Sequence, residues 1–171
     1  MSKSLSESGK IIPTVECLIV KDGKVLLLKR GETSKNFPGY WIGPGGHVDD
    51  GEDILTAAVR EVFEETGIRI SEEKINLKAI AIGNHIDRSE IYMVYYFLIT
   101  LNSKQDIINS DEGESSWINL SEIQKMEKIF PPFKYYLEHA LNPNSGILYT
   151  NVELEKLQIT KVLSRRTDKD Y

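Results

Sequence analysis

The sequence contains few of the residues that bind zinc or form disulfide bonds. Its 171 residues include one cysteine, Cys17, and three histidines that stand far apart along the chain. A single cysteine excludes an internal disulfide, and its position inside an apolar run favours a buried structural thiol. A zinc site needs clustered histidine or cysteine ligands, so the composition does not favour one.

Long apolar segments and clusters of basic residues are lacking as well. No apolar run is long enough to span a membrane, and Met1–Lys10 is serine-rich without the apolar core of a signal peptide. We therefore expect a flexible N-terminal tail over 1–10 and a cytoplasmic location. The net charge of −5 argues against nucleic-acid polymers and anionic membranes as partners. A small anionic substrate stays compatible with this charge, because a bound metal reverses the local sign.

The length predicts one domain, and the pattern of apolar residues predicts its sheet. A strand over Val15–Val20, a tight turn at Asp22–Gly23 and a strand over Lys24–Arg30 form a predicted hairpin. Leu77–Ile82 is a further predicted strand. Ile91–Ile99 is almost wholly apolar, which is typical of a central strand covered on both faces.

A helix is predicted between Asp53, which is suited to cap its first turn, and Gly67, which is suited to end it in a left-handed conformation. A Gly- and Pro-rich turn at Trp41–Gly45 precedes it. Apolar residues recur at helical spacing and predict the face that packs on the sheet: Leu55, Ala58, Val59 and Val62. A second helix, over Phe133–Leu141, carries a similar apolar stripe.

The other face of the first helix carries the chemistry. Glu61, Glu64 and Glu65 follow the spacing i, i+3 and i+4, so their carboxylates project from one side. Like charges at this spacing cost a few tenths of a kcal/mol per pair, roughly, and divalent cations would neutralise them. Hard carboxylate oxygens suit Mg²⁺ or Mn²⁺. A solvated Glu-rich face is the alternative interpretation.

The spacing of the stretch from Gly46 to Ile68 resembles the signature of the Nudix hydrolases. Its nine specified positions are filled by Gly46, Glu52, Arg60, Glu61, Val62, Glu64, Glu65, Gly67 and Ile68. From average residue frequencies, a chance match at a given start has a probability on the order of 10⁻¹⁰ to 10⁻⁹. The resemblance implies an α/β fold with a mixed β-sheet sandwiched between α-helices, over residues 11–141. It also implies an enzyme that hydrolyses a small-molecule nucleotide with Mg²⁺, for which Mn²⁺ is a substitute.

The resemblance also implies roles for particular residues. Glu61, Glu64 and Glu65 would hold the metal, with the Gly45 carbonyl as a further ligand. In the acidic loop Asp111–Glu114, Glu112 or Glu114 would complete the metal site or act as the base, and Glu112 is preferred. Arg60 and Glu52 would pair and brace the loop against the helix. An exposed acidic turn is the alternative for the 111–114 loop.

Substrate-binding candidates lie on both sides of the Gly-rich turn. Lys29 or Arg30, at the end of a strand, would meet phosphate, and Arg30 is the predicted contact. Phe37 and Trp41 would stack a base, although these rings would equally cover the core. Gly45 and Gly46 allow the backbone to approach a ligand closely.

The predicted substrate is a nucleoside triphosphate. The blocks around Trp41–Gly46 and Asp111–Trp117 are similar to Nudix enzymes that remove oxidised purine nucleoside triphosphates such as 8-oxo-dGTP. One departure is Ile42, where some of those enzymes carry a polar residue that reads the base. ADP-ribose or another nucleotide-sugar is the alternative substrate, and a non-catalytic nucleotide-binding module is the alternative class. A homodimer is left open.

Residues 142–171 form a C-terminal extension beyond the region of resemblance. Gly146–Thr150 predicts an extra strand, Leu154–Leu163 is weakly patterned, and Arg165–Tyr171 is predicted to be disordered. The sequence gives this extension no function.

Overall fold

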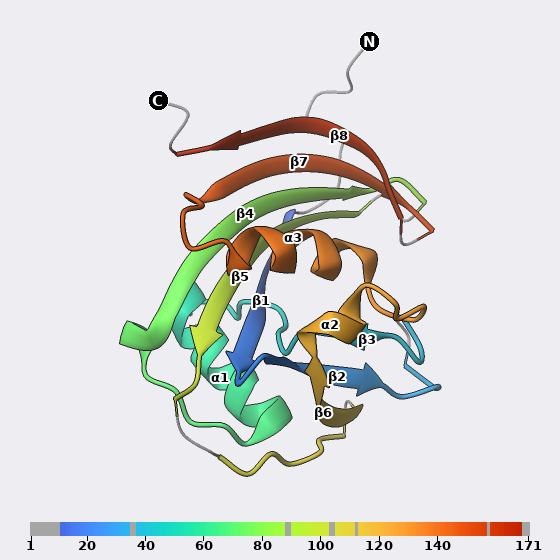
Figure 1. The fold of residues 1–171 in the computed structure, drawn as a ribbon. Helices are drawn as coiled ribbons and strands as arrows, with labels where there is room; N and C mark the ends of the chain where they lie inside the picture. Colours follow the sequence, from blue (N-terminus) through green and yellow to red (C-terminus); the bar gives the residue numbers. More distant parts are fainter. Residues whose placement is uncertain are drawn as a thin grey trace.

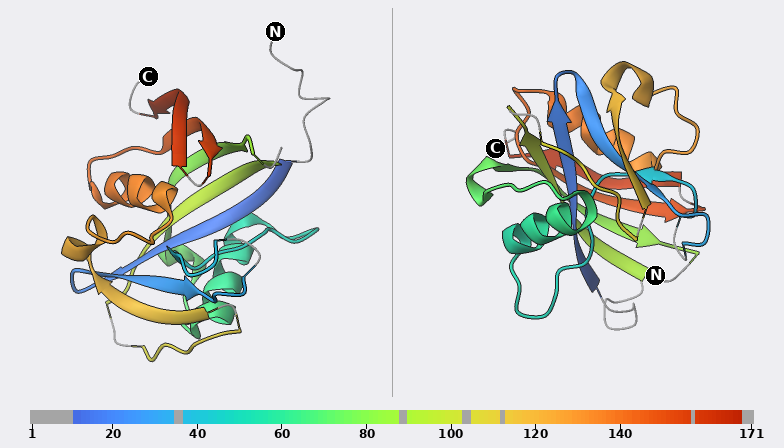
Figure 2. Two further views of the ribbon diagram at one scale, coloured as in Figure 1. Left: turned by 90° about the vertical axis from the view of Figure 1, so that its right-hand side faces the viewer. Right: turned by 90° about the horizontal axis from the view of Figure 1, so that it is seen from below.

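The computed structural model describes residues 11–34, 37–87, 90–102, 105–111, 113–156 and 158–168. A mixed β-sheet runs through this part of the chain, with helix α1 (Ile54–Thr66) on one face and helix α3 (Pro131–Leu141) on the other (Figure 1, Figure 2). A short helix α2 (Leu120–Ile123) and a 3-10 turn (Glu72–Lys74) lie in the connections. The predicted α/β sandwich is therefore confirmed.

The sheet has the order β3-β2-β1-β5-β4-β7-β8, and β6 pairs with β2. Its strands are β1 (Ile11–Lys21), β2 (Lys24–Arg30), β3 (Trp41–Ile42), β4 (Ile75–His85), β5 (Glu90–Thr100), β6 (Gly113–Asn119), β7 (Leu148–Glu155) and β8 (Gln158–Thr167). The β1–β5 and β4–β7 pairs are parallel, and the others are antiparallel. β5 is the central strand of this order, as its apolar sequence predicts.

The β1–β2 hairpin joins the two strands through a tight turn. Asp22 and Gly23 both have positive φ, at 48° and 72°, which suits the tight turn that the sequence predicts. The two strands pair next to the turn, Val20 with Val25 and Lys21 with Lys24. β2 pairs along its whole length with β6 and at its end with β3, and β1 lies beside β5 from Ile11 to Val20.

Residues of β1 alternate between two buried clusters, one under each helix. Cys17 and Ile19 pack with Val62 on the α1 side, and Leu18 packs with Phe133 on the α3 side. The predicted stripe of α3 is buried in full: Phe133, Tyr136, Leu137 and Ala140. The two hydrophobic clusters fix both helices on the sheet.

Both ends of α1 are as the sequence predicts. One carboxylate oxygen of Asp53 accepts hydrogen bonds from the backbone N–H groups of Leu55 (2.8 Å) and Thr56 (3.1 Å), and the bonds from Thr56 are the leading cause that lowers the pKa of Asp53. Gly67 closes the helix with a φ of 73°. Helix α3 begins two residues before its predicted start at Phe133, because Pro131 and Pro132 form its first turn. Proline is tolerated there, since the first N–H groups of a helix have no partner within it.

The C-terminal extension is a part of the sheet. β7 adds in parallel to β4, β8 pairs with β7, and the Tyr136 hydroxyl of α3 lies 2.7 Å from the Thr150 hydroxyl of β7. The prediction of disorder from Arg165 onward is wrong up to Thr167, which ends β8. The predicted tail over 1–10 lies outside the described residues. None of the described helices is long and apolar enough to cross a membrane.

Candidate active site

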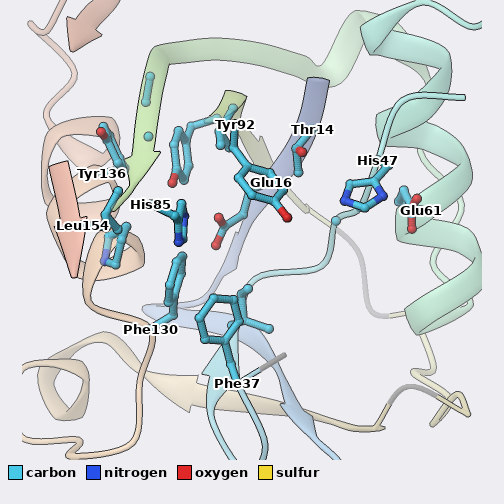
Figure 3. Close-up of a pocket in the computed structure, with 18 of the residues that line it drawn as sticks. Thr14, Glu16, Phe37, His47, Glu61, His85, Tyr92, Phe130, Tyr136 and Leu154 are labelled. Carbon is cyan, nitrogen blue, oxygen red and sulfur yellow. The ribbon is translucent and has the colours of Figure 1, made fainter. Parts of the chain in front are cut away.

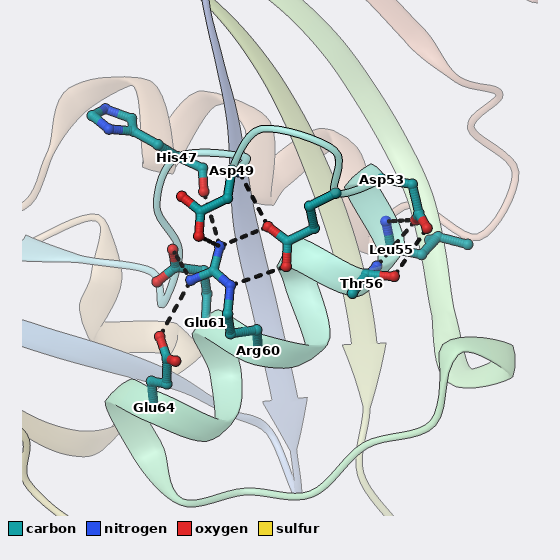
Figure 4. A network of polar contacts seen from close by, with 9 residues as sticks. His47, Asp49, Asp53, Leu55, Thr56, Arg60, Glu61 and Glu64 are labelled. Carbon is teal, nitrogen blue, oxygen red and sulfur yellow. Dashed lines mark hydrogen bonds and ion pairs between the residues drawn. The ribbon is translucent and has the colours of Figure 1, made fainter.

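Arg60 joins the loop before α1 to the helix itself (Figure 4). Its Nε and Nη2 donate to Glu52 Oε1 and Oε2 at 3.0 and 2.8 Å, and Nη2 also donates to the His47 carbonyl at 3.1 Å. The hydrogen bond from Arg60 is the largest cause that lowers the pKa of Glu52, and the same pairing raises the pKa of Arg60. The predicted Arg60–Glu52 pair is thus present.

The three carboxylates of α1 differ in exposure. Glu61 and Glu65 are buried, at 9% and 3% exposed, whereas the Glu64 side chain is 57% exposed. Arg60 Nη1 donates to Glu61 at 2.8 Å and to Glu64 at 3.2 Å. Glu65 Oε2 accepts the backbone N–H of Gly45 at 2.8 Å. One guanidinium group and one backbone amide therefore orient all three carboxylates.

The Gly-rich loop lies against β1 and against α1 at the same time. The N–H groups of Val15 and Cys17 donate to the carbonyls of Gly46 (2.9 Å) and Pro44 (2.8 Å). A Cβ at Gly46 would overlap the Glu61 carboxylate, and one at Gly45 would overlap the Val15 carbonyl. Glycine is required at both positions by this close approach.

The chemistry of these side chains fits a hard divalent cation. The carboxylate oxygens of Glu61, Glu64 and Glu65 are hard oxygen ligands of the kind that Mg²⁺ and Mn²⁺ prefer. Within the described residues, no three Asp, Glu, His or Cys side chains already enclose a position for a metal, and Arg60 bonds two of the carboxylates. Glu112 lies outside the described residues. Glu114, the alternative, is exposed on β6 opposite Lys29.

A cavity of about 450 Å³ opens beside the loop and extends below α3 (Figure 3). Five of the predicted site residues line it: Arg30, Phe37, Gly45, Gly46 and Glu61. Trp41, predicted to stack a base, is not among the lining residues. Its ring packs into the α3-side cluster, and its backbone bonds Lys128 and Phe130 at 2.7 and 2.9 Å. The alternative interpretation, in which the ring covers the core, therefore holds for Trp41.

Several residues that line the cavity were not predicted from the sequence. His85 ends β4, beyond the predicted strand Leu77–Ile82, and its side chain is only 8% exposed. Val152 and Leu154 come from β7, in the extension that had no predicted function. Phe130 packs its ring 4.8 Å from the ring of Phe37. None of these positions carries a local sequence signal, because distant segments bring them together.

Glu16 also lines the cavity, and its place in the sequence is unusual. It is a charged residue inside the apolar β1 strand, and it is only 5% exposed. Burial raises its pKa to about 8, partly offset by hydrogen bonds with the Gly43 backbone and the Tyr96 hydroxyl. Its Oε1 has no hydrogen-bond partner among the described residues. An isolated carboxyl in an apolar strand is a feature that sequence alone can flag.

A family model for the NUDIX domain matches residues 10–140. The chain is 34% identical over 121 residues to the nucleoside triphosphatase NudI of Salmonella agona, covering 64% of this chain and 84% of that protein. It is 31% identical over 113 residues to the uncharacterized Nudix hydrolase YvcI of Bacillus subtilis, covering 64% and 67%. The crystal structure of the mutator MutT protein from Bacillus halodurans is similar with a TM-score of 0.73 and 26% identity, covering 92% and 98%. The chain therefore belongs to the Nudix family and is a hydrolase that acts on nucleotide pyrophosphate bonds.

Proposed function

We propose that the protein hydrolyses nucleoside triphosphates, including oxidised purine nucleotides such as 8-oxo-dGTP. The observation that carries the proposal is the position of Glu61, which belongs both to the carboxylate network of α1 and to the lining of the cavity. A substrate with a base in the cavity would thus place its phosphates beside the carboxylates. The relative NudI, which is named a nucleoside triphosphatase, supports this choice.

Nudix hydrolases generally use divalent cations, and Glu61, Glu64 and Glu65 would hold the cation here. When bound, Mg²⁺ or Mn²⁺ supplies charge neutralisation at the phosphoryl oxygens and lowers the pKa of a bound water. Arg60 balances the charge of the carboxylates and keeps the Gly45–Gly46 loop against the helix through Glu52 and the His47 carbonyl. The Gly45 N–H fixes the Glu65 side chain.

The chain's own groups would hold the rest of the nucleotide. Phe37 and Phe130 offer aromatic surface to a base, a contact worth roughly 1–3 kcal/mol. Arg30 lines the same cavity and carries the positive charge that a triphosphate needs. The cavity volume of about 450 Å³ lies within the range of roughly 300–1,000 Å³ for small-ligand pockets.

The test is kcat/KM for dGTP, 8-oxo-dGTP, the other common triphosphates and ADP-ribose at one Mg²⁺ concentration, with products separated by chromatography. We expect the triphosphates to be the better substrates and the nucleoside monophosphate to be a product. The Glu72→Gln variant, changed at an exposed position on the 3-10 turn, serves as a matched control for Glu61→Gln, which should be inactive. Preferred cleavage of ADP-ribose to AMP and ribose phosphate would overturn the proposal.

A further inference from the structure

The substrate cavity contains a buried carboxyl group that the carboxylate network of α1 does not include. Glu16 belongs to β1, lies beside Tyr96 of β5 in the parallel register, and lines the cavity. In Figure 3 its carboxyl points away from Glu61 and toward the side of the cavity formed by His85 and Phe130. Glu16 is therefore placed at the base end of the cavity and not at the phosphate end.

One oxygen of this carboxyl has no hydrogen-bond partner in the part of the chain that the structure describes. The Gly43 backbone and the Tyr96 hydroxyl bond the group, but Oε1 has no hydrogen-bond partner among the described residues and is shielded from solvent. A buried oxygen without a partner destabilises the fold unless something binds it. The terminal torsion of glutamate is soft and roughly two-fold, so rotation by about half a turn exchanges the two oxygens and either one can face the cavity.

Other polar side chains line the cavity near Glu16, His85 and Tyr92 among them, but Glu16 carries the buried oxygen without a partner among the described residues. Ile42, the position at which a polar residue would read the base, lines the same cavity with an apolar side chain. Phe37 and Phe130 offer ring faces, which stack on every base alike. Glu16 bonds the backbone of Gly43, the residue directly after Ile42, and both side chains line the same cavity.

We propose that Glu16, in its ionised form, determines base specificity by accepting the N1–H of a 6-oxopurine, the guanine type of base. This inference rests on the proposed triphosphate hydrolysis and names the residue that selects its substrate. Guanine carries a donor at N1, whereas adenine at N1 and cytosine at N3 present a lone pair that faces the acceptor oxygen. Guanine also has its N2 amino donor beside N1, whereas the N3–H of thymine lies between two carbonyl oxygens that repel a carboxyl oxygen.

The contact with N1–H also predicts how Glu16 treats oxidised substrates. The edge that carries N1–H is unchanged when guanine is oxidised at C8. Glu16 would therefore hold guanine and 8-oxoguanine equally, and any preference between them would come from other groups. A change at Glu16 should alter kcat/KM for dGTP and 8-oxo-dGTP by the same factor.

The experiment compares wild type, Glu16→Gln and Glu16→Leu. The readout is the ratio of kcat/KM for dGTP to that for dATP at about pH 9, above the pKa of about 8 that burial gives Glu16. A general loss of activity cancels in a ratio measured on one protein. We expect wild type to prefer dGTP by about 10-fold or more, since a polar site rejects a base that leaves it unpaired. Glu16→Gln adds an amide donor that can pair with adenine N1, so it should lose most of the preference for dGTP. Glu16→Leu should reduce the ratio to within about 3-fold of unity.

A binding measurement separates this inference from the proposed reaction. Calorimetric titration of dGMP and dAMP without metal needs no turnover, and wild type should bind dGMP more tightly. A wild type that binds dGMP no more tightly than dAMP, or binds neither, contradicts the role of Glu16, and so does an unchanged kcat/KM ratio in Glu16→Leu. A protein that binds dGMP selectively but hydrolyses no triphosphate would overturn the proposed function alone.

Discussion

Arg60 and Glu52 form a two-point ion pair, with 3.0 Å between Nε and Oε1 and 2.8 Å between Nη2 and Oε2. Arg60 is on α1 and Glu52 is in the loop before it, so the pair fixes the loop that carries Gly45 and Gly46. The same guanidinium reaches Glu61 and Glu64 through Nη1. The loop and the carboxylates are therefore held by one side chain.

Replacing Glu52 with glutamine should reduce kcat without unfolding the protein. Glutamine keeps the size of the side chain but cannot form the charged two-point bond, so the loop would lose its orientation. Changes to groups that orient metal ligands reduce activity or affinity by about 10- to 100-fold, and we expect a loss in that range. Asp50→Asn, at an exposed position of the same loop, is the control and should keep wild-type kcat. Equal activity in both variants would show that the pair is not needed for turnover.

Glu64→Gln and Glu65→Gln should each reduce kcat by more than about 100-fold, beyond the loss typical of orienting groups. Both changes remove a negative charge that the proposed cation needs, while the shape of the side chain is kept. The melting temperature in metal-free buffer should change little, because the relief of repulsion on one helix face is offset by weaker contacts with Arg60 or the Gly45 N–H. Steady-state kinetics and thermal unfolding measure the two effects. If both variants retain full activity, the glutamates form only a solvated helix face.

Breaking the bond between Tyr136 and Thr150 should loosen the extension. The two hydroxyls are buried and 2.7 Å apart, so Tyr136→Phe or Thr150→Val leaves one of them without a partner. Each single change should lower the free energy of unfolding by about 1–3 kcal/mol. The double variant should lose less than the sum of the two. Urea unfolding measures all three, and additive losses would mean that the bond contributes nothing.

Stability should fall as pH rises from about 4.5 to about 8, and Glu16 should cause part of that fall. Its pKa rises from 4.5 to about 8 in the folded protein because of burial. Between these values the folded state keeps a proton that the unfolded state has lost, so its contribution is full below pH 4.5 and disappears as pH passes 8. The slope from this one group is about 1.4 kcal/mol per pH unit.

Glu16→Gln lacks this proton and should show a shallower dependence. The measurement is urea unfolding of both proteins at pH 5.5, 6.5 and 7.5. Other titrating groups contribute equally to the two proteins and cancel in the difference. Parallel pH profiles would mean that Glu16 titrates alike in the folded and unfolded states.

The parts of the site that the sequence predicted are local in the chain. Asp53 and Gly67 mark the ends of α1 through bonds to residues within four positions, and Arg60 reaches Glu52 over eight positions. Helical spacing alone brings Glu61 and Glu65 to one side. Such relationships follow from the geometry of one helix and its preceding loop, so they can be deduced without the fold.

The base end of the cavity could not be predicted in the same way. Glu16, His85 and Leu154 meet there because β1 pairs with β5, β5 with β4, and β4 with β7. Each of these pairings joins segments distant in sequence, and the parallel β4–β7 register decides which residues of the extension face inward. Trp41 was predicted to bind substrate but packs in the core. An aromatic ring next to the Gly-rich loop suits either place, so the sequence could not distinguish them.

The most direct test of the proposed chemistry is the rate of dGTP hydrolysis as a function of divalent cation, for wild type and Glu65→Gln. With a chelator present, wild type should show no turnover, and Mg²⁺ or Mn²⁺ should restore it. Glu65→Gln should remain slow at cation concentrations that saturate wild type. A wild-type rate that is unchanged by the chelator would contradict metal-dependent hydrolysis by the glutamates of α1.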